Sequence, residues 1–356
     1  MLGYTNEKQG SAFWQDLLAN RIETAEELEG RLGLKIPRLR EIIRKYPMRI
    51  SPHYLSLIKE KNDPIYKQCV PDPAELENDR GLVDPLAEER FSPLPGLTRR
   101  YPDRVLFLVS DQCATYCRFC NRKRKVGRRG TVTKETIQEG LRYIKAHKEV
   151  RDVLLSGGDP LLLETPQLET ILRYLRDIPH VQIIRIGTRV PCVLPQRVTP
   201  SLVSMLKKYH PLYINTHFNH PKEITPESAK ACSMLADAGI PLGCQTVLLR
   251  GVNDSVKTIK QLMEGLVRIR ARPYYLFQAD QARGTAHFWT PLDTGLEIIS
   301  ALQGNVSGLC IPHFCVDLPG GGGKVLLTPE SIQERQKDAL IIKNFEGELY
   351  EYPIYS

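Results

Sequence analysis

The sequence has little that would tie it to a membrane or to an oxidising compartment. Its 356 residues contain no apolar run of the roughly 18–20 residues that a membrane span requires. Residues 1–7 lack the charged-then-apolar pattern of a secretory signal. Nine cysteines are too few for a disulfide scaffold in a chain of this length, and their odd number argues against complete pairing. We therefore expect a cytoplasmic protein with reduced thiols and no membrane partner.

Basic residues are in modest excess and are concentrated in one segment. The formal net charge is +8, and residues 118–129 hold Arg118, Arg122, Lys123, Arg124, Lys125, Arg128 and Arg129. Such a run is typical of a solvated surface or of a nucleic-acid-binding patch. It is also typical of a positive region that offsets an anionic cluster or docks an acidic electron donor. Because the run begins inside a cysteine motif, we favour this last interpretation and expect no nucleic-acid partner.

Two kinds of pattern divide the chain. Residues 1–90 are polar, with short amphipathic segments such as 36–43, and the proline-rich residues 84–96 indicate a linker. Beyond residue 105, short apolar runs alternate with helical segments. From the second run to the sixth they recur about every 30 residues, which is the length of a βα unit. The runs are 105–109, 153–155, 182–186, 212–215, 242–249, 274–277 and 309–316.

Helix start signals separate these runs. Thr165, Thr199 and Thr225 each precede a proline and are predicted to cap a helix, and Gly239 is predicted to end the third of these helices. The pattern predicts an α/β fold, a partial (β/α) barrel over residues 91–327 with an N-terminal helical region (1–90) and a short C-terminal tail (328–356). Catalytic residues of such barrels lie at the C-terminal ends of the strands.

Three cysteines directly follow the first apolar run. Cys113, Cys117 and Cys120 have the spacing C-x3-C-x2-C. Three thiolates would leave one iron of a 4Fe–4S cluster open to another ligand, whereas zinc would need a fourth ligand that no neighbouring His or Cys supplies. The spacing resembles the signature of the radical S-adenosylmethionine (SAM) superfamily. This resemblance implies a 4Fe–4S cluster, SAM, and one electron from a low-potential donor of the flavodoxin or ferredoxin type.

Other candidate residues also follow the apolar runs. Gly158 lies in a turn that would allow close backbone approach to a ligand. His217 alone is more often a core residue than a ligand, and Gln245 is an amide within a run, where it needs partners. Asp280 and Asp317 follow the last two runs and could hold a cation or be ordinary loop aspartates.

Two further segments suit a phosphorylated cofactor. Four glycines, 320–323, precede Lys324 without the spacing of a P-loop. They would let the amine swing, as a lysine that forms a Schiff base with pyridoxal phosphate (PLP) must do; a flexible surface loop is the alternative. Arg100, Tyr101 and Arg104 precede the first run and suit a phosphate group, or form an exposed basic turn.

Together these segments resemble the lysine 2,3-aminomutase family, from about residue 50 to about residue 348. The resemblance is carried by residues 100–104, the cysteine motif, and residues 184–189, 194–197, 215–221, 247–254, 272–275, 316–324 and 343–347. It implies that Lys324 holds PLP covalently, with the phosphate bound by Arg100, Tyr101 and Arg104. It implies contacts to SAM from Gly158, His217 and Gln245. The substrate carboxylate would pair with Arg122, and the distal ammonium with Asp280 and Asp317.

The implied reaction moves the α-amino group of L-lysine to Cβ and gives β-lysine. Two anionic side chains favour a distal cation over a distal carboxylate, which favours lysine over glutamate. Alternatives are an aminomutase for arginine and a relative that acts on lysine for protein modification. A non-catalytic iron–sulfur or nucleic-acid-binding protein is a more distant alternative.

The sequence departs from the family pattern in two places. Longer members bind zinc through a cysteine at the position of Ser255 and a cysteine-containing tail. Here no cysteine follows Cys315, so we expect no structural zinc, and the family's swapped-dimer assembly is not implied, although a homo-oligomer is expected. Phe119 stands within the cysteine motif where histidine is common, with no sequence-based account of its effect.

Overall fold

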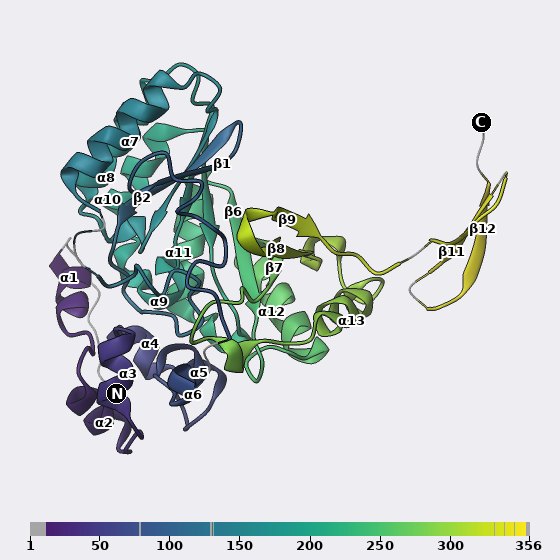
Figure 1. Cartoon of the computed structure of the whole chain (residues 1–356), viewed down its shortest axis with the longest axis horizontal. Helices are drawn as coiled ribbons and strands as arrows, with labels where there is room; N and C mark the ends of the chain where they lie inside the picture. Colours follow the sequence, from purple (N-terminus) through teal and green to yellow (C-terminus); the bar gives the residue numbers. More distant parts are fainter. Residues whose placement is uncertain are drawn as a thin grey trace.

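The central feature of the computed structural model is one nine-stranded sheet whose strands follow each other in chain order (Figure 1). The structure describes residues 12–77, 80–128, 130, 132–330, 332–337, 339–344 and 346–353, so Arg129 and Phe345 lie outside the described residues. The strands are β1 Leu97–Tyr101, β2 Arg104–Ser110, β3 Asp152–Gly157, β4 Ile183–Gly187, β5 Leu212–Thr216, β6 Leu242–Leu248, β7 Ala271–Gln278, β8 His313–Leu318 and β9 Gly323–Leu326.

The sheet is parallel from β2 to β8, and an antiparallel strand lies at each edge, β1 beside β2 and β9 beside β8. Helices connect the parallel strands, as in successive βα units. They are α7 Lys134–Ala146, α8 Thr165–Arg176, α9 Val190–Val193, α10 Pro200–Leu206, α11 Pro226–Asp237, α12 Val256–Arg268 and α13 Leu292–Leu302. The predicted α/β fold with a partial (β/α) barrel is confirmed.

Two of the three predicted helix caps are confirmed. The hydroxyls of Thr199 and Thr225 accept hydrogen bonds from backbone N–H groups at the starts of α10 and α11, and Gly239 follows α11 with a φ of +77°. The prediction for Thr165 is wrong, because the capping residue of α8 is Glu164. The Thr165 hydroxyl instead accepts a hydrogen bond from Arg197 at 3.2 Å.

The last predicted strand run is also corrected. Residues Gly308–Cys310 form a short 3-10 helix, and β8 begins only at His313. Pro312 lies between the two and has no N–H to donate to a neighbouring strand. The apolar side chains of residues 309–311 therefore mark a turn into the strand.

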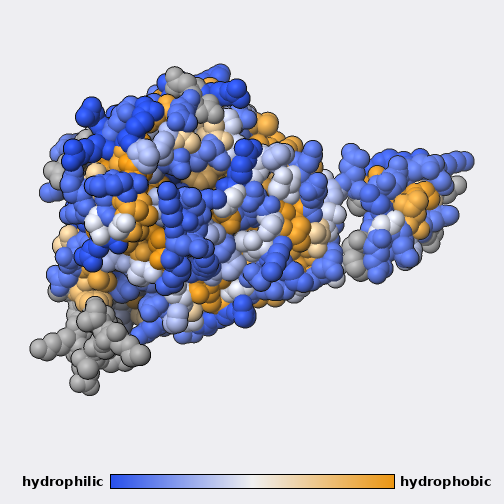
Figure 2. Space-filling view, turned by 90° about the horizontal axis from the view of Figure 1, so that it is seen from below, coloured by the Kyte–Doolittle hydropathy of each residue, from blue (hydrophilic) through white to orange (hydrophobic). Residues whose placement is uncertain are grey.

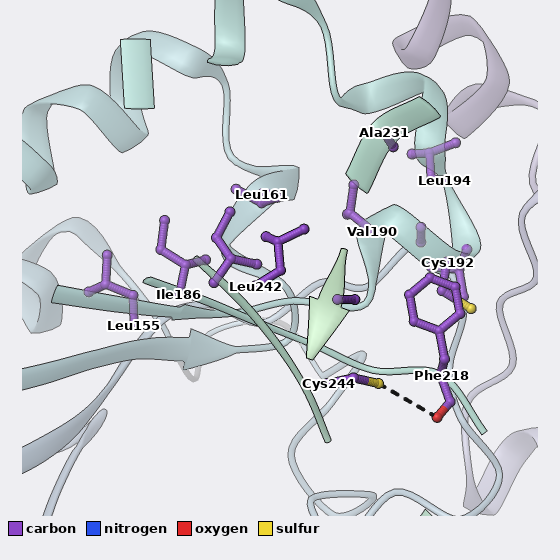
Figure 3. Packing of buried hydrophobic residues seen from close by; sticks show 14 of the residues in the cluster. Leu155, Leu161, Ile186, Val190, Cys192, Leu194, Phe218, Ala231, Leu242 and Cys244 are labelled. Carbon is purple, nitrogen blue, oxygen red and sulfur yellow. Dashed lines mark hydrogen bonds between the residues drawn. The ribbon is translucent and has the colours of Figure 1, made fainter. Parts of the chain in front are cut away.

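The N-terminal residues form short helices and share one hydrophobic core with the barrel. The helices are α1 Ala12–Ala19, α2 Ala25–Leu32, α3 Leu39–Lys45, α4 Pro52–Ser56, α5 Pro64–Cys69 and α6 Ala74–Glu77. Figure 3 shows part of this core, where Leu155, Ile186 and Leu242 of the strands pack with Leu161 and Val190 of the loops and helices. Among the described residues of this region the helices lie between 12 and 77, and residues 80–90 form bends and turns without a helix.

The segment predicted to be a linker lies against the barrel. Within it, the carbonyl of Pro85 accepts a hydrogen bond from Gly320 N–H at 3.2 Å, and just before it the backbone N–H of Leu82 donates to the carbonyl of Gln281 at 2.8 Å. Glu88 is buried. The segment therefore covers the end of the barrel, and the domain boundary at residue 90 stays a prediction.

A separate three-stranded sheet projects from the barrel (Figure 1). Its strands are β10 Ile332–Arg335, β11 Ala339–Lys343 and β12 Leu349–Pro353. Figure 2 shows apolar side chains on this projection, which include exposed Ile332 and Leu349. No helix in the described residues is long and apolar enough to cross a membrane.

Candidate active site

A cavity of about 1040 Å³ runs along the inner face of the sheet. Every residue that the sequence predicts for the cluster, for SAM, for PLP and for the substrate lines this cavity. They are Arg100, Tyr101, Arg104, Cys113, Cys117, Cys120, Arg122, Gly158, His217, Gln245, Asp280, Asp317 and Lys324. Residues more than 200 positions apart in sequence are thus brought to one chamber. Many of them follow the carboxyl ends of parallel strands, which meet at one end of a barrel, whereas Arg100 and Lys324 lie on the antiparallel edge strands β1 and β9.

The three motif cysteines lie in the loop that follows β2. They are partly exposed, whereas the other six cysteines are buried. Burial raises the pKa of the Cys113 thiol well above its usual range and that of Cys120 to about 11, so both thiols are protonated at pH 7 when no metal is bound. In the described part of the chain, no three His, Cys, Asp or Glu side chains converge as on a single ion. The cysteines of a cubane cluster bind separate iron atoms.

Glu75 in α6 anchors this loop from the N-terminal region. Its carboxylate is buried and pairs with Arg118 at 2.5 and 2.9 Å and with Lys123 at 2.6 Å. Lys123 also donates to the carbonyl of Gly284, beyond β7. Burial alone would raise the pKa of Glu75, but the two cations hold it at about 2. Glu75 therefore links the cysteine loop to α6, and Lys123 links the same loop to the segment after β7.

Arg122 and Arg124 of the basic run also pair with carboxylates. Arg122 Nε lies 2.7 Å from Glu88, and Arg124 lies 2.9 Å from Asp84. Arg118 and Lys123 are buried against Glu75, so these two cations are not exposed for an acidic partner to contact. That the run offsets the charge of a cluster stays a prediction. The acidic residues that pair with the run lie 34 to 48 residues earlier in the chain, so no local pattern reveals the pairing.

We expect Glu75→Gln to lower the free energy of unfolding by about 3 kcal/mol, because it leaves two buried cations without their carboxylate. Urea denaturation monitored by circular dichroism at pH 7 measures this change. The matched control is Glu41→Gln, which removes an exposed ion pair with Arg38 and should lower the free energy of unfolding far less, because solvent screens an exposed pair. Equal losses in the two variants would show that the Glu75 pairs do not stabilise the fold. Because the folded-state pKa of Glu75 is lowered, the difference should shrink as pH falls from 4.5 toward 2.

The glycine-rich turn after β8 places Lys324 directly opposite Asp317. The two residues are cross-strand partners in β8 and β9, and Lys324 Nζ lies 2.8 and 3.0 Å from the carboxylate oxygens of Asp317. Gly320, Gly321 and Gly323 all have positive φ, so the glycines are required for the tight turn. Lys324 N–H donates to the Tyr101 hydroxyl at 3.1 Å, which joins this turn to the predicted phosphate group.

Asp280 is the second predicted substrate aspartate, and it lies at the end of β7. Burial raises its pKa to about 6, and the neighbouring Asp317 adds to the rise. Asn121 donates to Asp280 at 2.7 Å and orients it. The sequence analysis missed Asn121, although its position directly after Cys120 was a possible signal.

The glycines after β3 allow two loops to approach each other closely. A Cβ atom on Gly158 would lie 2.2 Å from the carbonyl oxygen of Gln112, and one on Gly157 would lie 2.0 Å from that of Ser110. The loop after β3 thus needs glycine simply to pack against the backbone before Cys113, with or without a ligand. A contact from Gly158 to SAM stays a prediction.

His217 and Phe119 form an aromatic wall beside the cysteine loop. Their rings stack with centroids 5.7 Å apart. Burial lowers the pKa of His217 well below its usual range, and Arg189 lowers it further, so the imidazole is neutral at pH 7. Its Nε2 is buried and has no hydrogen-bond partner among the described residues. The stacking with His217 accounts for an aromatic side chain at Phe119.

Comparison with known proteins places this site in a family. A model of the Radical SAM superfamily matches residues 107–263, and one described as Lysine-2,3-aminomutase matches residues 299–355. The chain is 51% identical over 346 residues to the L-lysine 2,3-aminomutase of Clostridium subterminale, covering 95% of this chain and 83% of that protein. The chain belongs to the lysine 2,3-aminomutase family. As a family member it is an isomerase, and its superfamily implies a 4Fe–4S cluster and SAM.

This aminomutase has other relatives of similar length. It is 52% identical over 347 residues to the L-lysine 2,3-aminomutase of Acetoanaerobium sticklandii, covering 95% of this chain and 84% of that protein. It is also 43% identical over 355 residues to the glutamate 2,3-aminomutase of Clostridioides difficile, covering 98% and 84%. The resemblance stated from the motifs is confirmed, but relatives with two different amino acids in their names match almost the whole chain.

Proposed function

We propose that this aminomutase converts L-lysine to β-lysine. The observation that carries the proposal is the bond from Lys324 Nζ to Asp317, because here a primary ammonium on a four-carbon chain is already bound by a carboxylate in the cavity. Asp280 supplies a second carboxylate, which lies close enough to Asp317 that the Asp317 charge helps to raise the pKa of Asp280. A site with two carboxylates favours a distal cation and disfavours the side-chain carboxylate of glutamate.

We propose that the cluster is held by Cys113, Cys117 and Cys120. In this proposal Gly158, His217 and Gln245 contact SAM, and PLP is held by Lys324 with Arg100, Tyr101 and Arg104 at its phosphate. When bound, SAM on the reduced cluster supplies the radical that removes hydrogen from lysine Cβ, and PLP carries the migrating nitrogen. Arg100 fits this role, because its Nη2 is buried without a hydrogen-bond partner in the described part of the chain and can donate to an anionic oxygen.

The chain's own residues orient the substrate at both ends. Arg122 would pair with the α-carboxylate, and its guanidinium is already fixed by Glu88 at 2.7 Å. Asp280 and Asp317 would hold the ε-ammonium at the opposite end. Fixing both ends limits which hydrogen the radical can reach, so positioning accounts for the choice of Cβ.

We expect kcat/KM for lysine to fall as pH decreases through about 6. Asp280 takes up a proton in this range because burial and Asp317 raise its pKa, and the neutral acid no longer attracts the ε-ammonium. The active form is the carboxylate, so activity is retained above pH 6. Initial rates between pH 5 and 8 measure the profile. In Asp280→Asn the low-pH limb centred near 6 should disappear, and an unchanged limb would assign that titration to another group.

A competition experiment tests the substrate assignment. Reduced, reconstituted protein with PLP and SAM is incubated anaerobically with equal amounts of L-lysine, L-arginine and L-glutamate, and the products are separated by mass spectrometry against β-amino acid standards. We expect β-lysine as the main product. β-Arginine would keep the two-carboxylate site and change the substrate, whereas β-glutamate would contradict the roles of Asp280 and Asp317.

We also propose a homo-oligomer in the cytoplasm that receives its electron from a flavodoxin or a ferredoxin.

A further inference from the structure

Arg189 is a buried cation beside one of the three motif cysteines. It follows β4, and its Nη1 donates a hydrogen bond to Cys117 Sγ at 2.7 Å. Among the side chains that the structure describes, Arg189 alone donates such a bond to a motif cysteine. Its guanidinium also lies 5.4 Å from the centre of the Phe119 ring. Arg189 ends the 184–189 segment that carries the family resemblance, but neither the resemblance nor the motif spacing assigned it a role.

A buried network holds the guanidinium in place. Its Nη2 donates to the Tyr54 hydroxyl at 3.0 Å, to Gln68 at 2.7 Å and to Glu223 at 2.8 Å. Glu223 is itself fully buried, and accepts a hydrogen bond from Tyr54 at 2.6 Å. These partners come from α4, from α5 and from the loop after β5, so the guanidinium cannot turn away from Cys117 without breaking contacts to three parts of the fold.

The backbone of Arg189 is fixed as well. Its N–H donates to Asp159 at 2.7 Å, and Asp159 also accepts a hydrogen bond from the Thr188 hydroxyl. Asp159 belongs to the turn that contains Gly158. The Asp159 carboxylate therefore joins the loop after β3 to the backbone of Arg189.

We propose that Arg189 is a positioning residue that sets the reduction potential of the cluster bound through Cys117, an inference that rests on the cluster assignment made above. Reduction adds one electron to the cluster, with no bond made or broken and no proton taken up. A cation that donates to a ligand sulfur stabilises the reduced form, which carries one more negative charge. Glu223 offsets part of that charge, so Arg189 and Glu223 should act with opposite sign.

The test measures the potential of reconstituted full-length protein without substrate. The cluster is titrated anaerobically with a soluble low-potential reductant, and the reduced form is followed by electron paramagnetic resonance. Arg189→Gln should make reduction about tenfold less favourable, which for a one-electron couple is a shift of about 59 mV to more negative potential. Arg189→Lys keeps the charge and should shift the potential less. Glu223→Gln should shift it to more positive values.

A buried arginine that does not contact a cysteine gives the matched control. Arg197 is 1% exposed and donates to the carbonyls of Leu161 and Leu163. Arg197→Gln should also lower the unfolding temperature but leave the potential unchanged. A shift of the same size in this variant would mean that the potential reports general loosening of the fold, and would overturn the proposal.

Three other results would count against Arg189. One is an unchanged potential in Arg189→Gln at full iron and sulfide content. The second is a shift of the same sign in Arg189→Gln and Glu223→Gln. The third is an unchanged potential with weaker SAM binding, which would assign the guanidinium to SAM. Cys117→Ala tests the assumption underneath: if that variant takes up and reduces the same cluster as the unmodified protein, the cluster assignment itself fails.

Discussion

Replacing Lys324 with alanine is expected to reduce β-lysine formation by roughly 10⁴-fold or more, because an amine that forms a covalent bond to its cofactor has no substitute. The absorption band of covalently bound PLP should vanish, while the iron and sulfide content stays at the unmodified level. The substitution should leave the cluster intact, because Lys324 lies on β9 and the cysteines lie in the loop after β2. Anaerobic turnover, absorption spectra and metal analysis on the same preparation measure all three.

Lys324→Arg is the matched control for this variant. Arginine keeps a cation opposite Asp317, so the ion pair is retained, but guanidinium does not form the covalent bond. Both variants should therefore be inactive, and only Lys324→Ala should lose the ion pair. Turnover within tenfold of the unmodified enzyme in either variant would refute the assignment of Lys324.

Replacing Asp317 with asparagine is expected to lower kcat/KM for lysine by roughly 30-fold or more. Asp317 is 8% exposed at its side chain, and removing one partner of a buried ion pair costs about 2–5 kcal/mol. The KM for lysine should rise and kcat should fall, because a substrate held at one end only is misaligned for hydrogen removal. Steady-state rates across lysine concentrations separate the two effects.

The control for Asp317 is another aspartate of the same cavity. Asp152 lies at the start of β3 and pairs with Arg185 at 2.8 Å. Asp152→Asn should leave the lysine KM within about twofold, since an ion pair that stays clear of the substrate contributes little to its binding. If Asp152→Asn and Asp317→Asn raise the KM equally, the effect comes from the total charge of the cavity and not from a specific contact.

The sequence predicted the position of the site well, for a simple reason. Side chains at the carboxyl ends of parallel strands share one end of the barrel, so Cys113, His217 and Asp280 could be assigned to one place from the order of the apolar runs alone. The family resemblance then supplied Arg100 and Lys324, which lie at the edge strands. Local chemistry likewise predicted the caps at Thr199 and Thr225.

Long-range pairing could not be predicted. Glu75 lies 43 residues before Arg118, and only the fold brings the acidic N-terminal segment against the basic run. Arg189 lies three residues after the apolar run 182–186, but nothing local indicates that its guanidinium reaches Cys117. Thr165 failed as a cap because its hydroxyl serves the distant Arg197. Each miss depends on a partner remote in sequence.

The bond between Lys324 and Asp317 has a thermodynamic consequence. Asp317 cannot hold the ammonium of its own chain and that of an incoming amino acid at full strength, so the two cations compete for it. When PLP takes up the Lys324 amine, that competitor is removed. Affinity for lysine should therefore rise with cofactor loading, and by reciprocity lysine should favour the loaded enzyme. In the proposed assignment, the lysine that holds PLP would therefore make the binding of substrate and cofactor cooperative.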